Sequence, residues 1–435
     1  MIYGENMKRI LALFILLALF ATLFVGCKKD DTNTQDPGTG GGEEVELVYV
    51  DLKKDDLSSY VEVDEKYYKG LSITLDPDRL HPFYIESHII EQLCANKSKE
   101  TVEGDGIISV GDVVSIFYKG YYLDGEGKKV YFAGGSNHGR SSYDLEIGSG
   151  GFIPGFEYNM IGKAVSEYSK ESPMIVEAYF PHNYQAEDVA GKVVYFEVYV
   201  EIKDGKYQIK EYDAPEFTEE FITETLDISE EELSGYEGDT LIERYRSMAR
   251  ELLIIKTGLD ADTLATEAFW DSVLEGAVVT DYPSGNLKDV FDEVMVEIEA
   301  YYRSNPNYAY YYPTLELFTC VYFGIEEGGD LQSEVNAVAK SHLKPLFSLY
   351  RVAAKEGFIP TEQEHADETV KYLADELAKN NITRENYESD EKFLEALDTY
   401  KKYLVSKFGE DAFEDMIDQK IIMRRIIALV EVVEN

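Results

Sequence analysis

Residues 148–157 constrain the fold of this chain more than any other stretch. They read Gly-Ser-Gly-Gly-Phe-Ile-Pro-Gly-Phe-Glu, so glycines that permit a tight turn are followed directly by Phe152 and Ile153. Pro154 suits the first position of a helical turn, because its ring fixes φ near the helical value. The segment therefore predicts a turn that directs two large apolar side chains towards the floor of a pocket, in place of a polar ligand site.

A strand and a turn are expected upstream of this segment. Residues 111–120 read Gly-Asp-Val-Val-Ser-Ile-Phe-Tyr-Lys-Gly, and their alternation places Val114, Ile116 and Tyr118 on one face. Asp-Gly at 124–125 then predicts a turn, after which the chain returns through Phe132.

A third block follows at residues 179–192, Tyr-Phe-Pro-His-Asn-Tyr-Gln-Ala-Glu-Asp-Val-Ala-Gly-Lys, and an alternating strand over 193–202 comes after it. In order and spacing the three blocks resemble FKBP-type peptidyl-prolyl isomerases, and the third has the form found in trigger factors. The resemblance implies an α+β fold: an FKBP-like antiparallel β-sheet domain with a short helix, near 156–161, followed by an all-helical trigger-factor-type C-terminal domain.

The resemblance also implies a pocket that acts without covalent chemistry. Rotation about an X–Pro bond has a barrier of about 20 kcal/mol that arises from amide resonance. A dry aromatic pocket favours the twisted, less polar amide over the planar one. Aligned to the family, the residues implied for this pocket are Tyr118, Phe132, Tyr143, Phe152, Ile153, Phe156, Tyr184 and Phe196.

One departure from the family pattern bears on rate. The family usually places Asp or Glu after the pocket Phe, whereas Ala133 follows Phe132 here. In the family that acid bonds the tyrosine at the position of Tyr118. We therefore expect slow turnover with proline binding retained.

The N-terminal residues are typical of an exported lipoprotein. Met7-Lys8-Arg9 precedes an apolar run over 10–25, which is shorter than the roughly 20 residues of a spanning helix. Residues 24–27, Phe-Val-Gly-Cys, resemble a lipobox in which Cys27 is lipidated; the alternative is an uncleaved anchor. Residues 28–44 are polar and rich in Gly, Asp and Thr, which predicts a flexible tether.

Charge and cysteine usage limit the partners. The formal net charge of −43 disfavours nucleic acid, since phosphate binding needs clustered cations. Cys94 and Cys320 are expected to be buried free thiols, although a bridge is possible. We expect no cofactor and no metal, because the histidines lack ligand spacing and no nucleotide loop occurs.

The second half changes to helical periodicity from about residue 214. Helices are expected from 241, 264, 287 and 410, the last of them as far as about 433, and caps are expected at Thr240, Gly357 and Thr361. Residues 344–364 resemble a helix–turn–helix motif of trigger factors. The ribosome-docking motif of that family is absent. Residues 305–313 are rich in tyrosine, and we expect a loop packed on neighbouring helices or a client-binding surface.

These observations predict five segments: a signal peptide (1–26), a tether (27–44), a strand and helix linker region (45–109), an isomerase domain (110–204) and a helical chaperone-like domain (214–435). The linker region is expected to carry strands at 45–50, 60–63 and 71–75 and a helix over 79–97.

The first functional hypothesis is a lipid-anchored isomerase and chaperone on the extracytoplasmic face of the cell membrane, whose partners are unfolded or proline-containing exported polypeptides. The second is a holding chaperone or scaffold with an inactive or weak isomerase domain. A substrate-binding lipoprotein would explain the signal and the tether but not the three ordered blocks.

Overall fold

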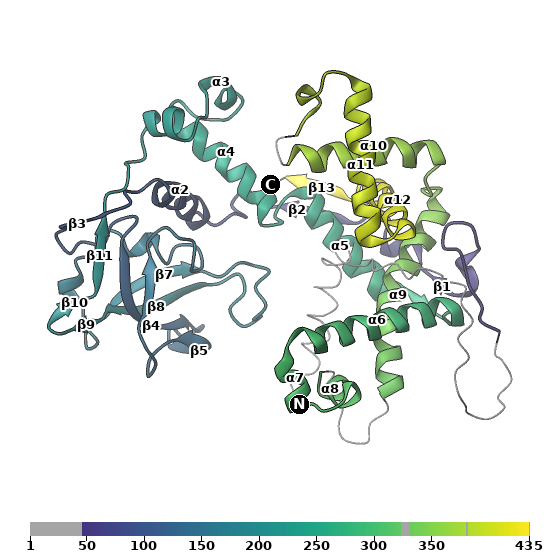
Figure 1. Ribbon diagram of the computed structural model, residues 1–435, viewed down its shortest axis with the longest axis horizontal. Helices are drawn as coiled ribbons and strands as arrows, with labels where there is room; N and C mark the ends of the chain where they lie inside the picture. The colour runs from purple at the N-terminus through teal and green to yellow at the C-terminus, as the bar shows by residue number, and fades with distance from the viewer. Residues whose placement is uncertain (1–45, 323–330, 380–381, 435) are drawn as a thin grey trace. The chain divides into compact units, whose positions relative to one another are not determined.

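The computed structural model describes residues 46–322, 331–379 and 382–434 (Figure 1). The apolar run, Cys27 and the tether lie outside these residues. No helix within the described ranges is long and apolar enough to cross a membrane.

The described chain divides into two compact units that interleave along the sequence. The unit that carries the three isomerase-like sequence blocks, called the isomerase unit below, contains residues 75–263, and the helical unit contains the segment before residue 75 together with residues 264–433. The segment before residue 75 thus belongs with the C-terminal helices, and residues 214–263 belong to the same unit as the sheet. The domain boundaries expected from the sequence remain predictions.

A curled antiparallel sheet forms the centre of the isomerase unit (Figure 1). Its strand order is β3-β11-β4-β8-β7, and β5 and β6 also pair with β4. The strands are β3 (Thr101–Val102), β4 (Val113–Leu123), β5 (Lys129–Ser136), β6 (Tyr143–Glu146), β7 (Met174–Tyr179), β8 (Val193–Val200) and β11 (Ile209–Tyr212). A separate pair joins β9 (Ile202–Lys203) to β10 (Lys206–Tyr207).

Alternation along β4 and β8 builds the core of this sheet. Val114 and Ile116 of β4 are fully buried, and every second residue of β8 from Val194 to Val200 is buried with them. The face expected from the sequence of β4 is therefore confirmed. The helix expected near 156–161 is a 3₁₀ turn, η3 (Tyr158–Met160), and a second such turn is η4 (Val165–Glu167).

Helices of the same unit pack beside the sheet. The elements are α2 (Phe83–Ala95), a π-helical turn η5 (Phe221–Thr225), α3 (Glu230–Leu233) and α4 (Leu241–Lys256). Ile89 and Leu93 of α2 pack in one buried cluster with Phe221 and Tyr245. The helix expected over 79–97 is thus confirmed with tighter ends, and α4 begins with the expected capping box of Thr240 and Glu243.

The helical unit is built around α9, which packs against α6 (Figure 1). Its helices are α5 (Ala261–Gly276), α6 (Ser284–Ser304), α7 (Pro306–Tyr311), α8 (Leu315–Tyr322), α9 (Leu331–Glu356), α10 (Glu362–Ala378), α11 (Asp390–Phe408) and α12 (Glu410–Ile427), with a 3₁₀ turn η6 (Arg384–Asn386). Gly357 ends α9 at φ +69°, and Thr361 caps α10, both as expected. The fold class, a sheet domain and a helical C-terminal region, is confirmed.

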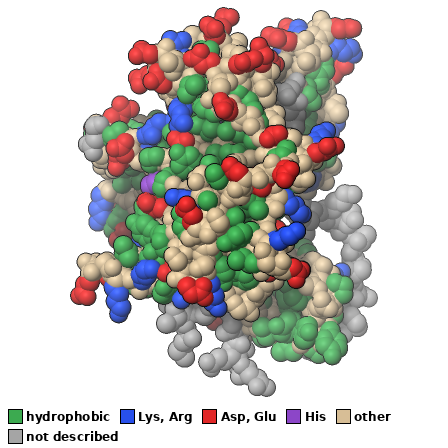
Figure 2. Space-filling view, turned by 90° about the vertical axis from the view of Figure 1, so that its left-hand side faces the viewer, with side chains coloured by type: hydrophobic (Ala, Val, Ile, Leu, Met, Phe, Trp, Pro, Cys, Tyr) green, Lys and Arg blue, Asp and Glu red, His purple; other side chains and the backbone are tan. Residues whose placement is uncertain are grey.

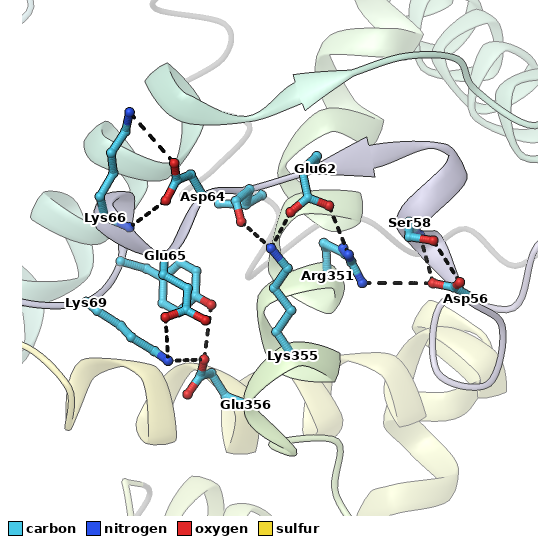
Figure 3. Close-up of polar contacts among 12 residues, drawn as sticks. Asp56, Ser58, Glu62, Asp64, Glu65, Lys66, Lys69, Arg351, Lys355 and Glu356 are labelled. Carbon is cyan, nitrogen blue, oxygen red and sulfur yellow. Dashed lines mark hydrogen bonds and ion pairs between the residues drawn. The ribbon is translucent and has the colours of Figure 1, made fainter.

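The residues before β2 (Ser72–Leu75) are fixed to α9 by charged side chains (Figure 3). This segment contains η1 (Leu57–Ser59), β1 (Val61–Glu62) and η2 (Glu65–Tyr67). Glu62 accepts a hydrogen bond from Arg351 at 2.9 Å and pairs with Lys355, while Lys69 pairs with Glu356 at 2.8 Å. Beneath these ion pairs, Leu57, Val61 and Val63 are buried against α9.

Four local expectations were wrong. Residues 46–50 form no strand; the Val50 amide donates to the Asn286 side chain at 2.9 Å instead. The last helix ends at Ile427, and β13 (Glu431–Glu434) then pairs with β2 (Ser72–Leu75). Residues 306–311 form the helix α7 and no loop, because Asn305 caps it and Pro306 occupies its first turn. Cys320 is only half-buried, whereas Cys94 is buried; both are free.

Two short strands of the sequence analysis do appear in the helical unit. Residues 60–63 contain β1, which pairs with β12 (Val278–Val279), and residues 71–75 contain β2. Both lie at the edge of the helical unit, where a strand of two to four residues pairs with one partner only.

Candidate active site

The residues expected at the pocket come from six places in the isomerase unit. Tyr118 lies on β4, Phe132 on β5, Tyr143 on β6 and Phe196 on β8. The other four lie in the loop before η3 and in the loop after β7: Phe152, Ile153, Phe156 and Tyr184.

Four rings form the floor of this site. Phe152 stacks on Phe156 with ring centroids 4.1 Å apart, and Phe196 meets Phe156 edge-on at 4.9 Å. Tyr118 approaches Phe152 edge-on at 5.2 Å, and its ring lies 6.3 and 6.2 Å from Phe156 and Phe196. Stacked and edge-to-face pairs are the favoured arrangements of aromatic rings. Phe156 is fully buried and Phe196 nearly so, which makes the floor part of the core of the sheet.

Phe132 is positioned by a bulge and by two glycines. Between Lys119 and Tyr121 the pairing of β4 with β5 shifts, so that extra residues of β5 lie opposite a single residue of β4. A Cβ on Gly120 or on Gly135 would come within 2.3 Å of the Phe132 ring. The ring thus occupies space that only glycine leaves free, and it contacts Phe196 at 5.8 Å.

Tyr143 and Tyr184 form an exposed rim. Their side chains are 45% and 43% exposed, whereas Phe152 and Ile153 are half-buried. Tyr143 meets Phe152 edge-on at 5.6 Å. Tyr184 contacts Phe180 at 4.5 Å, and Phe180 contacts Phe132 at 5.4 Å. The structure therefore joins seven of the expected residues through ring contacts, with Phe180 as the link to Tyr184. Ile153 is the eighth and packs against the same core.

Glu157 holds the glycine-rich loop and was not assigned a role from the sequence. Its carboxylate accepts hydrogen bonds from the backbone amides of Gly148 (2.7 Å), Gly150 (3.3 Å) and Phe152 (3.1 Å). Burial raises the pKa of Glu157, and these backbone hydrogen bonds oppose that shift. The signal in the sequence was an acid directly after a buried aromatic residue, nine residues beyond the first loop glycine.

Asn137 was also missed. It is buried, its side-chain oxygen accepts from the Tyr118 amide at 2.8 Å, and its side-chain nitrogen donates to the Ile116 carbonyl at 3.0 Å. Asn137 therefore completes the backbone pairing of β4 where the bulge of β5 interrupts it. An asparagine directly after a strand predicts only a turn from the sequence alone.

The Tyr118 hydroxyl is a polar group carried by the floor itself, since the Tyr118 ring contacts the other three floor rings. Within the described ranges it has no hydrogen-bond partner, and Ala133, where the family pattern has an acid, is exposed. The site thus offers apolar walls, one free phenol and no acid at the usual position. Such a set can bind proline and favour a twisted amide, and it offers no group for covalent catalysis.

Comparisons with known proteins agree with this geometry. Residues 104–201 match the family of FKBP-type peptidyl-prolyl cis-trans isomerases. The chain is 31% identical to the trigger factor of Macrococcus caseolyticus over 238 residues, which are 55% of this chain and 48% of the relative. It is 33% identical to the trigger factor of Staphylococcus saprophyticus over 53% of this chain and 46% of that protein. It is 31% identical to the trigger factor of Levilactobacillus brevis over 71% of this chain and 62% of that protein.

These alignments span about half to two thirds of the length of the trigger factors. A solved structure on substrate recognition by the trigger factor chaperone overlaps 85% of this chain and 71% of its own at 16% identity, with a TM-score of 0.32, too low for a comparison of folds.

Proposed function

We propose that this trigger-factor-like chain, whose residues 104–201 form an FKBP-type peptidyl-prolyl cis-trans isomerase domain, catalyses prolyl isomerisation in unfolded polypeptides and binds them as a chaperone. The observation that carries the proposal is the aromatic floor. Tyr118, Phe152, Phe156 and Phe196 come from separate segments and meet in one set of stacked and edge-on rings.

The geometry explains how this site would act. A client proline packs on the apolar floor, where water is excluded and the charge-separated resonance form of the planar amide is poorly solvated. The twisted amide is less polar and loses less on entering this site, so the barrier falls. Tyr118, one of the floor rings, donates a hydrogen bond to the client through its free hydroxyl. Glu157 fixes the glycine-rich loop, and the loop in turn holds the Phe152 ring in the floor.

An isomerase assay on a short X–Pro peptide tests this function. The full chain without its first 26 residues is compared with Phe132→Ala, after circular dichroism and hydrogen exchange show that both are folded. We expect a measurable rate for the parent and a clear loss in Phe132→Ala. Equal rates in two folded proteins would show that catalysis does not use this site.

A second function, a holding chaperone with a feeble isomerase domain, is favoured by one observation. Ala133 leaves the Tyr118 hydroxyl without the acid that the family pattern places there. This function predicts that the parent binds proline peptides but does not raise their isomerisation rate. The same assay, with a binding measurement beside it, separates the two functions.

The proposed location is the extracytoplasmic face of the cell membrane, with a lipid anchor on Cys27, so that the clients are exported polypeptides. Support comes from the apolar run over 10–25 and the lipobox-like residues 24–27. Labelling with palmitate in a bacterial host tests it. The label is expected on the parent and not on Cys27→Ala; persisting label would contradict lipidation.

A further inference from the structure

A hollow of about 320 Å³ lies in the isomerase unit beside the aromatic site. It has four walls: α2, the glycine-rich loop, the loop after β7 and the end of α4. Phe152 and Ile153 belong both to this hollow and to the residues of the aromatic site. A polypeptide whose proline lies on the aromatic floor therefore has a second recess directly beside it.

The walls of the hollow are held together by packing and hydrogen bonds. Glu86 of α2 binds Arg246 of α4 through two hydrogen bonds, of 2.6 and 3.2 Å, and the two helices lie side by side (Figure 1). The Gly155 amide donates to the Ser87 hydroxyl at 3.1 Å, and a Cβ on Gly155 would come within 2.4 Å of Phe83. The recess is thus a fixed feature of one compact unit.

Two side chains of opposite charge line the hollow and are available to a ligand. Glu91 of α2 is half-buried and Lys256 of α4 is exposed, and neither has a hydrogen bond or an ion pair within the described ranges. Burial raises the pKa of Glu91, and Lys256 opposes that shift. A cation of the client that contacts the half-buried Glu91 directly gains more from this attraction than it loses by repulsion from Lys256. Lys256 is exposed, so water screens its charge.

We propose that this hollow is a second subsite for the client chain, which takes a residue flanking the proline and prefers Lys or Arg there through Glu91. The proposal rests on the proposed isomerase function, since it places the proline on the aromatic floor. A volume near 320 Å³ is at the low end for ligand sites and fits side chains, not a folded partner. The acidic balance of the whole chain, −43, favours the approach of basic segments to the protein in general. Figure 2 shows Asp and Glu side chains, with Lys and Arg among them, around hydrophobic ones on the side from which it is viewed.

The test compares two series of short proline peptides, one with Lys, Gln or Leu directly before the proline and one with these residues two places before it. The measured quantity is the ratio of kcat/KM for the Lys peptide to that for the Gln peptide, obtained by NMR exchange so that no protease preference enters. In at least one series we expect a ratio of roughly three to ten in the parent, as for a partly buried ion pair. Glu91→Gln is expected to bring this ratio close to one, and Lys256→Gln to raise it.

Glu103→Gln is the matched control, because Glu103 is exposed and lies outside the hollow, so it removes the same charge elsewhere. The control is expected to keep the parent ratio. A ratio near one in the parent, or the same ratio in the parent and in Glu91→Gln, would overturn the subsite.

Failure of the proposed isomerase function would give a different result from failure of the subsite. If the parent accelerates no peptide, the same peptides are measured for binding by fluorescence anisotropy. Tighter binding of the Lys peptide that is lost in Glu91→Gln would support the subsite on a non-catalytic client site. Equal binding by the two proteins would overturn it.

Discussion

Two groups of aromatic side chains among the described residues invite comparison: the floor of the isomerase unit, and the rings that α6, α7 and α8 bring together in the helical unit. In both places rings meet edge-on or tilted: Phe196 lies 4.9 Å from Phe156, and Tyr308 lies 5.1 Å from Phe318. The exposure of the rings differs. Phe156 is fully buried, whereas Tyr310 is 81% and Tyr311 68% exposed.

The difference in exposure follows from the elements that hold each group of rings in place. The floor is set by β4, β8 and a loop that Glu157 holds through three backbone amides, so its rings have little freedom. Tyr310 and Tyr311 lie on the short helix α7 and their rings are mostly in water, whereas Tyr308 of the same helix packs on Phe318. A fixed apolar floor suits one chemical step on one kind of residue, and exposed tyrosines suit variable contacts at low entropic cost.

The largest expected effect is that of Phe156→Ala. Removing a fully buried ring from the floor should lower the free energy of unfolding of the isomerase unit by about 3–5 kcal/mol. Hydrogen exchange of the β4 and β8 amides measures the stability of the isomerase unit separately from that of the helical unit. Phe156→Leu, which conserves most of the volume, should cost less than about 1.5 kcal/mol. Unchanged exchange in Phe156→Ala would mean that the floor is not part of the core.

The next effect concerns the loop. Glu157→Gln replaces one acceptor oxygen with an amide nitrogen, so at least one buried backbone N–H loses its partner. We expect a loss of about 1–3 kcal/mol and faster exchange of the Gly148 and Gly150 amides. Glu167→Gln is the control, because Glu167 is exposed. Equal exchange in the two variants would show that Glu157 does not fix the loop.

Ala133→Asp tests the missing acid. A hydrogen bond to the free Tyr118 hydroxyl is worth about 1 kcal/mol, and if it acts in the transition state it raises the isomerisation rate about fivefold. Desolvation of the new carboxylate is small, because position 133 is exposed. Ala133→Asn introduces a side chain of nearly the same shape as Asp but without charge, so its rate beside that of Ala133→Asp separates the effect of shape from the effect of charge. A rate no higher than that of the parent, with folding intact, would mean that the site is adapted for binding and not limited by the acid.

In the helical unit, the ion pairs of Glu62 should make stability depend on pH. Lys355 and Arg351 lower the pKa of Glu62, so the folded pKa lies below the unfolded one. The stability from this group is therefore present above the unfolded pKa, about 4.3, and is lost as pH falls through the folded pKa. Glu62 is half-exposed, so less than about 1 kcal/mol is expected. Unfolding of the parent and of Glu62→Gln should differ at pH 7 and converge near pH 3; a gap that does not narrow would exclude the ion pairs as its cause.

The smallest effect on stability is expected for Tyr310→Ser with Tyr311→Ser. Both rings lie in water, so each change should alter the free energy of unfolding by less than about 0.5 kcal/mol. Binding of an unfolded polypeptide, followed by fluorescence anisotropy, should weaken if this surface contacts clients. Loss of stability on the scale of Phe156→Ala would instead make these tyrosines core residues and remove the contrast.

The sequence by itself determined the elements that depend on local signals. The alternation of Val114 and Ile116 predicts β4, the capping box at Thr240 predicts the start of α4, and Gly357 predicts the end of α9, because each signal acts within one turn or one strand. The motif over residues 148–157 also predicts which side chains line the site, through resemblance to a family.

Only the tertiary structure decided the roles that depend on distant partners. Glu157 becomes the holder of a loop because burial leaves backbone amides with no other acceptor. Asn137 replaces strand pairing at a bulge that no local pattern marks. The segment before residue 75 packs on α9, and residues 217–256 pack on α2, because apolar side chains far apart in the chain are buried together. Hydrophobic burial depends on which surfaces meet and not on their order along the chain, and for that reason these arrangements could not be predicted from the sequence.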